Sequence, residues 1–197
     1  MNIPNKLTLL RVCLTPVFLL LLTLSFPYHT LWALAVFCLA ALTDLLDGHI
    51  ARKRNLVTNF GKFLDPLADK ALTTAALIAF LAMGRIDIWA VMLVLIREFM
   101  VMSIRLIAAK NGVVVAADIF GKAKTVAQFA SIIVMLCAIE FASWRQTLLA
   151  GAAVPDAVYD TVLLVAQILI WISVVMTVLS GLRYVWLNRH FIADGIQ

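Results

Sequence analysis

Charged side chains are scarce in this chain: Asp, Glu, Lys and Arg together make up 14% of its 197 residues, whereas 64% of the residues are hydrophobic. A soluble domain carries about a quarter charged residues, so this composition excludes an ordinary water-soluble protein and is typical of a chain that crosses a membrane several times. No stretch is both long and polar enough to form a separate soluble domain. We therefore expect one membrane-embedded unit that comprises residues 1–197.

Cysteine is also rare. The three cysteines, Cys13, Cys38 and Cys137, lie far apart in apolar runs. No CxxC pair and no Cys/His cluster is present, which excludes a zinc site or a disulfide framework of the usual spacing. We expect these cysteines to be small, buried packing residues.

Long apolar runs dominate the rest of the sequence. Runs of roughly 20 residues, the length that spans a bilayer, are predicted at about 5–26, 31–54, 61–83, 88–110, 118–142 and 158–187. Six spans place both termini on the same side of the membrane. The predicted fold is therefore all-α, a polytopic membrane protein with six transmembrane helices.

The basic residues indicate which side this is. Twelve of the 16 Lys and Arg residues lie on or near the side of the termini, and only Arg85 and Arg145 fall in the opposite loops. Because cytoplasmic loops are enriched in Lys and Arg, we expect both termini to be cytoplasmic. This bias explains the net charge of +5 better than nucleic-acid binding does, and acidic membrane lipids are a second partner for these residues.

Acidic residues are few, yet four of them fall within 26 residues: Asp44, Asp47, Asp65 and Asp69. Carboxylates are costly inside a membrane, so this cluster needs compensating charge, and divalent cations supply it most simply. On helices, spacings of three and four residues bring each pair onto one face. Two facing carboxylate pairs suit two hard cations, Mg²⁺ or Mn²⁺.

Small residues and an arginine accompany the first pair. Gly48 and Ala51 lie on the same predicted helix face as Asp44 and Asp47, where they permit either close helix packing or the close approach of a ligand. Arg52 offers a fork of donors suited to phosphate oxygens, or else anchors the helix at the cytoplasmic surface.

Together these residues form the pattern D-x2-D-G-x2-A-R-x8-G-x3-D-x3-D, which resembles the signature of the CDP-alcohol phosphotransferase family. Every position is filled, by Asp44, Asp47, Gly48, Ala51, Arg52, Gly61, Asp65 and Asp69. The resemblance implies six transmembrane helices, a homodimer and a cytoplasm-facing site for two divalent metal ions. It also implies transfer of a phosphatidyl or similar group from a CDP-linked donor to an alcohol, with release of CMP.

The resemblance assigns a role to each motif residue. It implies that Asp69 is the catalytic base and that the metal ligands are Asp44, Asp47, Asp65 and Asp69. The CDP-binding set that it implies is Asp44, Gly48, Ala51, Arg52 and Gly61. No serine or cysteine is placed as a covalent nucleophile, which favours direct transfer.

Two further stretches resemble bacterial members of the family that use glycerol 3-phosphate as the acceptor. They are residues 2–11, and the residues that run from Ile96-Arg97-Glu98 through Arg105 to Gly121-Lys122-Ala123-Lys124-Thr125. The resemblance implies that CDP-diacylglycerol donates its phosphatidyl group to sn-glycerol 3-phosphate. It also implies a location in the bacterial cytoplasmic (inner) membrane.

The acceptor is a dianion and needs cationic partners beyond the metals. Arg105, Lys122 and Lys124 lie near the cytoplasmic ends of the fourth and fifth spans and are predicted to bind its phosphate, although ordinary positive-inside placement explains each one singly. Arg97 and Glu98 lie deeper. Adjacent helical residues point about 100° apart, so these two need not pair with each other, and we expect each to have a polar partner on another helix.

Three alternatives remain open from the sequence. Within the family, the acceptor can be serine, inositol phosphate or phosphatidylglycerol. Intramembrane prenyltransferases also use paired aspartates with Mg²⁺, but they need more spans and leave the G-x2-A-R segment unexplained. An ion transporter can carry carboxylates too, although it releases no CMP.

Overall fold

The computed structural model describes residues 3–54, 59–110, 119–147 and 155–189. Within these ranges the side chains of residues 3–5, 44–54, 59–67, 69, 110, 119 and 145–147 lie outside the description. The secondary structure of the described residues is six helices: α1 (Ile3–Thr23), α2 (His29–Arg54), α3 (Asn59–Ala82), α4 (Ile88–Lys110), α5 (Ile119–Thr147) and α6 (Asp156–Leu187). The predicted all-α architecture is confirmed, and each helix overlaps one predicted apolar span, although most of their ends differ by one to five residues.

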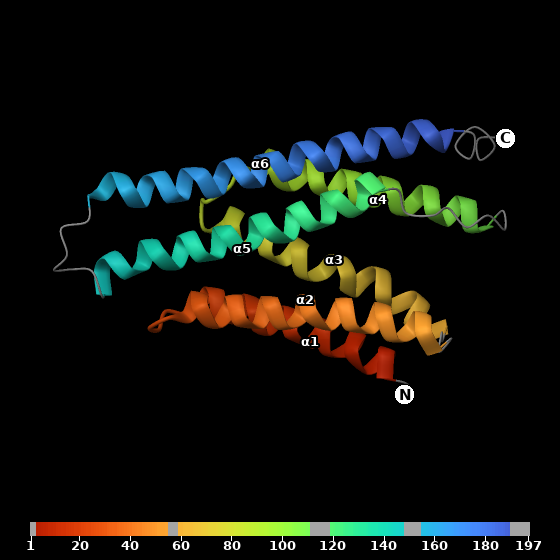
Figure 1. Cartoon of the computed structure of the whole chain (residues 1–197), viewed down its shortest axis with the longest axis horizontal. Helices are drawn as coiled ribbons and strands as arrows, with labels where there is room; N and C mark the ends of the chain where they lie inside the picture. The colour runs from red at the N-terminus through yellow and green to blue at the C-terminus, as the bar shows by residue number, and fades with distance from the viewer. Residues whose placement is uncertain (1–2, 55–58, 111–118, 148–154, 190–197) are drawn as a thin grey trace.

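The helices form a bundle in which successive helices run in opposite directions, so that α1 begins and α6 ends at the same end (Figure 1). Helix α1 packs on α2 and α3, and α6 packs on α4 and α5. Contacts of α5 with α2 and α3 join these two groups. The aromatic rings of Phe18 in α1 and Phe37 in α2 lie with their centroids 5.6 Å apart, and both residues are fully buried.

The turn between α3 and α4 shows how local sequence ends a span. Gly84 has a φ of +66°, a left-handed conformation that glycine adopts without steric cost. The amide of Arg85 donates to the carbonyl of Phe80 at 2.8 Å, and the amide of Gly84 donates to the carbonyl of Leu81 at 2.9 Å. This pair of bonds is the Schellman motif, which satisfies the last carbonyls of the helix.

The outer surface of the bundle is apolar. Phe99 and Leu106 of α4 are 66% and 73% exposed, and similar side chains cover the other helices. Within the described ranges, α1, α5 and α6 each contain a stretch long and apolar enough to cross a membrane. Shorter apolar stretches occur in α2 and α3, at His29–Thr43 and Lys70–Ala82. A surface of this kind is stable in lipid and not in water, so the chain is an integral membrane protein.

The prediction that the cysteines are buried is wrong. Cys13, Cys38 and Cys137 are free and exposed on the helix surfaces. A thiol is only weakly polar, so an apolar environment outside the bundle accommodates it as readily as the core does.

Candidate functional site

The motif residues lie on two helices that meet at one end of the bundle. Positions 44, 47, 48, 51 and 52 belong to the last turns of α2, and positions 61, 65 and 69 belong to the first turns of α3. The two helices contact each other. The predicted helical setting of the motif is therefore present in the backbone. The side chains of Asp44, Asp47, Gly48, Ala51, Arg52, Gly61, Asp65 and Asp69 lie outside the described part of the structure.

A cavity of about 540 Å³ lies beside these helices, between α3, α4 and α5. Lys70, which directly follows position 69, forms part of its wall together with Arg105 and Lys122. The full lining is Lys70, Thr73, Arg97, Glu98, Val101, Arg105, Gly121, Lys122, Lys124, Thr125, Val126, Gln128 and Phe129. A volume of this size accommodates a small substrate.

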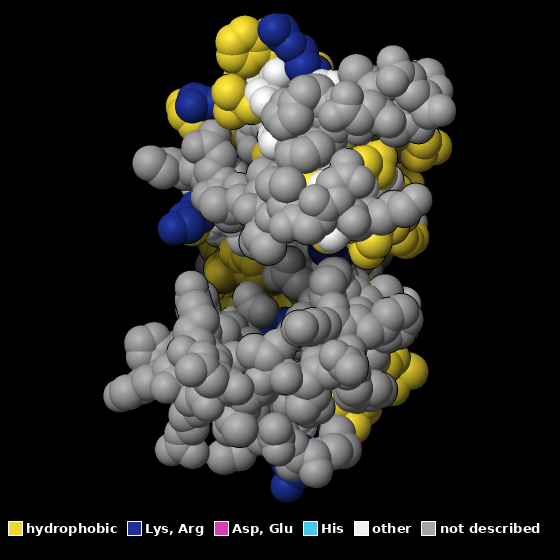
Figure 2. Space-filling model, turned by 90° about the vertical axis from the view of Figure 1, so that its right-hand side faces the viewer, with side chains coloured by type: hydrophobic (Ala, Val, Ile, Leu, Met, Phe, Trp, Pro, Cys, Tyr) yellow, Lys and Arg dark blue, Asp and Glu magenta, His cyan; other side chains and the backbone are white. Residues whose placement is uncertain are grey.

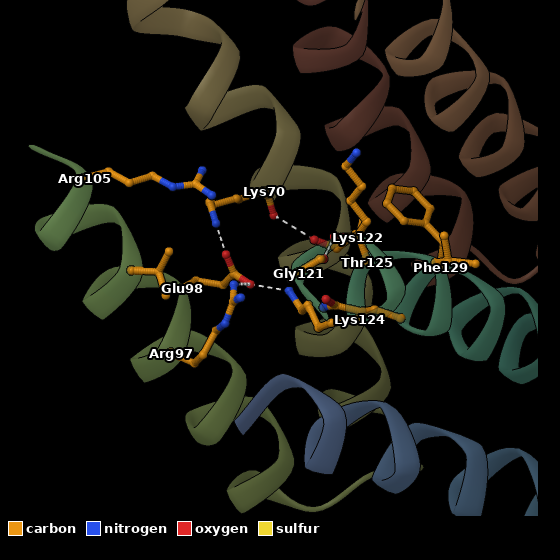
Figure 3. A pocket seen from close by; sticks show the side chains of 13 residues that line it. Lys70, Arg97, Glu98, Arg105, Gly121, Lys122, Lys124, Thr125 and Phe129 are labelled. Carbon is orange, nitrogen blue, oxygen red and sulfur yellow. Dashed lines mark hydrogen bonds and ion pairs between the residues drawn. The ribbon is translucent and has the colours of Figure 1, made fainter. Parts of the chain in front are cut away.

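Glu98 is the centre of a buried ion-pair cluster in this cavity. Its carboxylate binds the ammonium groups of Lys70 and Lys124 and the guanidinium of Arg97, whose Nη1 atom lies 3.0 Å from Oε1. Figure 3 shows these three cations converging on Glu98 from α3, α4 and α5. Burial of a carboxylate is tolerated when several cations surround it, so Glu98 ties three helices together.

Arg97 links this cluster to a fourth helix. Its Nη2 atom donates a hydrogen bond to Ser180 of α6 at 3.0 Å. The expected interhelical partners of Arg97 and Glu98 are thus confirmed. The two adjacent side chains also pair with each other, because both bend toward the same cavity.

The cavity lining has a strong excess of positive charge. Lys70, Arg97, Arg105, Lys122 and Lys124 carry five positive charges against the single negative charge of Glu98, a net charge of +4. Lys122 and Arg105 are both exposed and have no acidic partner among the residues that the structure describes. The Arg105 guanidinium lies 5.7 Å from the ring centroid of Tyr184. Such a lining is suited to a small molecule with more than one negative charge.

Positive charge is also visible at one end of the bundle. Figure 2 looks onto the end of the bundle where α2 ends and α3 begins. The charged side chains that are coloured on this face are Lys and Arg.

The structure brings the three predicted phosphate-binding residues to one cavity but in different environments. Arg105 and Lys122 are exposed, whereas Lys124 is 5% exposed and paired with Glu98. Sequence reasoning missed Lys70 and Gln128 as lining residues. A signal for Gln128 was present, because Gly121, Lys124, Thr125 and Gln128 recur at intervals that share one helix face.

Comparison with known proteins agrees with this geometry. The profile of the CDP-alcohol phosphatidyltransferase family matches residues 1–179. A Bacillus subtilis protein named CDP-diacylglycerol–glycerol-3-phosphate 3-phosphatidyltransferase is 37% identical over 198 residues, which cover 93% of each chain. Proteins of the same name from Rickettsia bellii and Sodalis glossinidius are 34% and 33% identical and cover 93% and 96% of each chain. The family resemblance drawn from the aspartate motif is confirmed.

Proposed function

Since this chain belongs to the CDP-alcohol phosphatidyltransferase family, we propose that it transfers the phosphatidyl group of CDP-diacylglycerol to sn-glycerol 3-phosphate. The products are phosphatidylglycerophosphate and CMP. The observation that carries this choice of acceptor is the cavity with a net charge of +4 beside the motif helices. A zwitterionic acceptor such as serine does not need an excess of positive charge in its binding site, whereas a phosphate dianion does.

In this proposal the acceptor phosphate binds Arg105, Lys122 and Lys124. Lys122 and Arg105 reach the cavity from two different helices, α5 and α4, so they can hold the phosphate from two sides. Lys124 contributes from the buried side, where Glu98 already fixes its position. Charge-assisted hydrogen bonds of this kind are shorter and stronger than neutral ones.

The donor set of the motif fits a pair of divalent cations. Asp44 and Asp47 belong to α2, and Asp65 and Asp69 belong to α3, two helices in contact. Their carboxylate oxygens are the hard ligands that Mg²⁺ and Mn²⁺ prefer, and we assign them that role. Bound ions would supply neutralisation of negative charge on the donor diphosphate.

The remaining motif residues bind the donor and activate the acceptor. Asp44, Gly48, Ala51, Arg52 and Gly61 form the CDP-binding set. The small residues leave room for the nucleotide, and the guanidinium donates hydrogen bonds to phosphate oxygens. Asp69 accepts the proton of the acceptor hydroxyl, because an alcohol is a poor nucleophile at neutral pH.

The membrane arrangement is part of the same proposal. All six helices span the bacterial cytoplasmic membrane as one unit of residues 1–197, with both termini and the cavity on the cytoplasmic side. The charge of the coloured surface in Figure 2 supports this orientation. The protein works as a homodimer among membrane lipids.

The acceptor site is tested by the substitution Lys122→Gln in purified protein. We expect the KM for glycerol 3-phosphate to rise about tenfold or more, because one charge-assisted contact contributes roughly 1.5–3 kcal/mol. The KM for CDP-diacylglycerol stays unchanged. Arg189→Gln is the matched control, since it removes another exposed cation outside the cavity lining. An equal rise in both KM values for Lys122→Gln would assign this residue to the donor or to the fold.

A further inference from the structure

Gln128 of α5 is a buried polar residue that the proposed reaction does not yet use. It is 4% exposed and borders the cavity between α3, α4 and α5. Its backbone carbonyl accepts a hydrogen bond from Ser131 at 2.9 Å. Its side-chain amide makes no recorded hydrogen bond to the residues that the structure describes, and its atoms are not among the fully enclosed unpartnered atoms of those residues, so the amide remains accessible from the cavity.

An amide that borders a cavity can bind a molecule that enters it. A primary amide has two donor hydrogens and an acceptor oxygen, which it offers to water or to a bound molecule in the cavity. Because Gln128 borders the cavity, a molecule bound there can supply the missing hydrogen bonds. A hydroxyl group suits this amide, because a hydroxyl both donates and accepts hydrogen bonds.

The position of Gln128 along α5 indicates which hydroxyl this is. Lys124 and Gln128 lie one turn apart on the same helix face, about 6 Å along the helix axis. Lys122 and Arg105, which are exposed, stand nearer the opening of the cavity, and Gln128 is buried. A phosphate held by the cations therefore places the carbon chain of a short phosphorylated alcohol beside Gln128.

We infer that Gln128 is a specificity-determining residue whose side-chain amide hydrogen-bonds the C2 hydroxyl of the bound glycerol 3-phosphate. The inference rests on the proposed function. The phosphate of this acceptor occupies the cationic residues, and its C1 hydroxyl must face the aspartate-bearing helices to react. The C2 hydroxyl is the polar group that remains, and it lies between the other two.

The test compares two acceptors, sn-glycerol 3-phosphate and 3-hydroxypropyl phosphate, which lacks only the C2 hydroxyl. We expect wild-type protein to favour glycerol 3-phosphate in kcat/KM by about tenfold or more, because the analogue leaves the amide unpaired. In Gln128→Met, which keeps the length of the side chain and removes its polarity, the ratio should fall to within about threefold of unity. The KM for CDP-diacylglycerol should not change.

Gln167→Met is the matched control. Gln167 lies on α6 and donates to the carbonyl of Arg85 at 2.9 Å, away from this cavity, so the acceptor ratio should stay at its wild-type value. If Gln128→Met does not accumulate, Gln128→Asn shortens the side chain by one methylene and should lower the ratio in the same way.

The outcomes separate the inference from the function on which it rests. Transfer to glycerol 3-phosphate with a ratio that Gln128→Met or Gln128→Asn leaves unchanged would overturn the role of Gln128 alone. Equal use of both acceptors by wild-type protein would overturn it as well. Wild-type protein that transfers to another alcohol and not to glycerol 3-phosphate would overturn the proposed function, and the inference with it.

Discussion

Gly181 of α6 lies directly against Arg97 of α4: a Cβ atom at position 181 would come within 2.6 Å of the Arg97 Cγ atom. Because Gly181 has no side chain, the Arg97 side chain fits between α4 and α6. From there it reaches Ser180 and Glu98 at 3.0 Å each. Close helix approach at small residues is the usual way in which membrane helices associate.

The substitution Gly181→Ala should therefore destabilise the protein. Displacing a packed side chain costs about 1–3 kcal/mol, which outweighs the gain of up to about 1 kcal/mol that alanine brings to a helix. Thermal unfolding in detergent measures the change. Gly121→Ala is the control for stability, because nothing lies within 4 Å of a Cβ atom there. Equal melting temperatures for the two variants would contradict the close packing.

Glu98→Gln should lower the free energy of unfolding far more than the same change at another buried glutamate. Removing the charge of Glu98 leaves Arg97, Lys70 and Lys124 without their shared anion, a loss of about 3–5 kcal/mol for a buried pair. Glu140 is 4% exposed, and its Oε1 accepts the indole N–H of Trp144 at 2.8 Å.

An amide oxygen at position 140 keeps that bond, so Glu140→Gln should change the free energy of unfolding by no more than about 1 kcal/mol. Chemical or thermal unfolding of both variants in the same detergent gives the comparison. Similar losses at the two positions would show that Glu98 acts as an ordinary buried carboxylate and not as the centre of a cluster.

The helices were predictable from sequence, and the contacts between them were not. Long apolar runs separated by turn residues such as Gly84 fix where each helix begins and ends. A helix that is apolar on all sides carries no periodic signal to distinguish its lipid-facing side from its packed side. This is why Cys38 was misplaced and why the cluster at Glu98 became visible only in three dimensions.

In the candidate site, too, the motif was predictable from sequence and the contacts between helices were not. Fixed spacing identified the aspartate motif, because pattern and chemistry both lie within two neighbouring helices. Lys70 and Glu98, by contrast, form an ion pair between two different helices. The sequence does not specify how these helices are rotated relative to each other, so this pair was not predictable.

Activity should require a divalent cation and every metal-binding aspartate. Asp44→Asn, Asp47→Asn and Asp65→Asn each keep the size of the side chain and remove its charge, so we expect release of CMP to be lost while the protein still accumulates in the membrane. Asp160→Asn, at an exposed position of α6, is the control and should retain activity. Full activity in excess chelator would refute the metal assignment.

Both termini should lie in the cytoplasm. We expect a reporter fused after Gln197 to be cytoplasmic and one inserted near Gly151 to lie on the opposite side, because only two of the 16 basic residues fall in the opposite loops. Accessibility labelling of intact cells reads out each position. The same side for both reporters would contradict six spans in this orientation.

The most direct test of the proposed function is a competition among acceptors. Purified protein receives CDP-diacylglycerol, Mg²⁺ or Mn²⁺, and equal concentrations of glycerol 3-phosphate, serine and inositol phosphate in one reaction, and mass spectrometry identifies the lipid products. We predict phosphatidylglycerophosphate as the main product, with one CMP released per lipid formed, because the cavity lined by Arg105 and Lys122 favours a phosphate dianion. Phosphatidylserine or an inositol lipid as the main product would contradict that acceptor, and no release of CMP with any acceptor would contradict transfer from a CDP-linked donor.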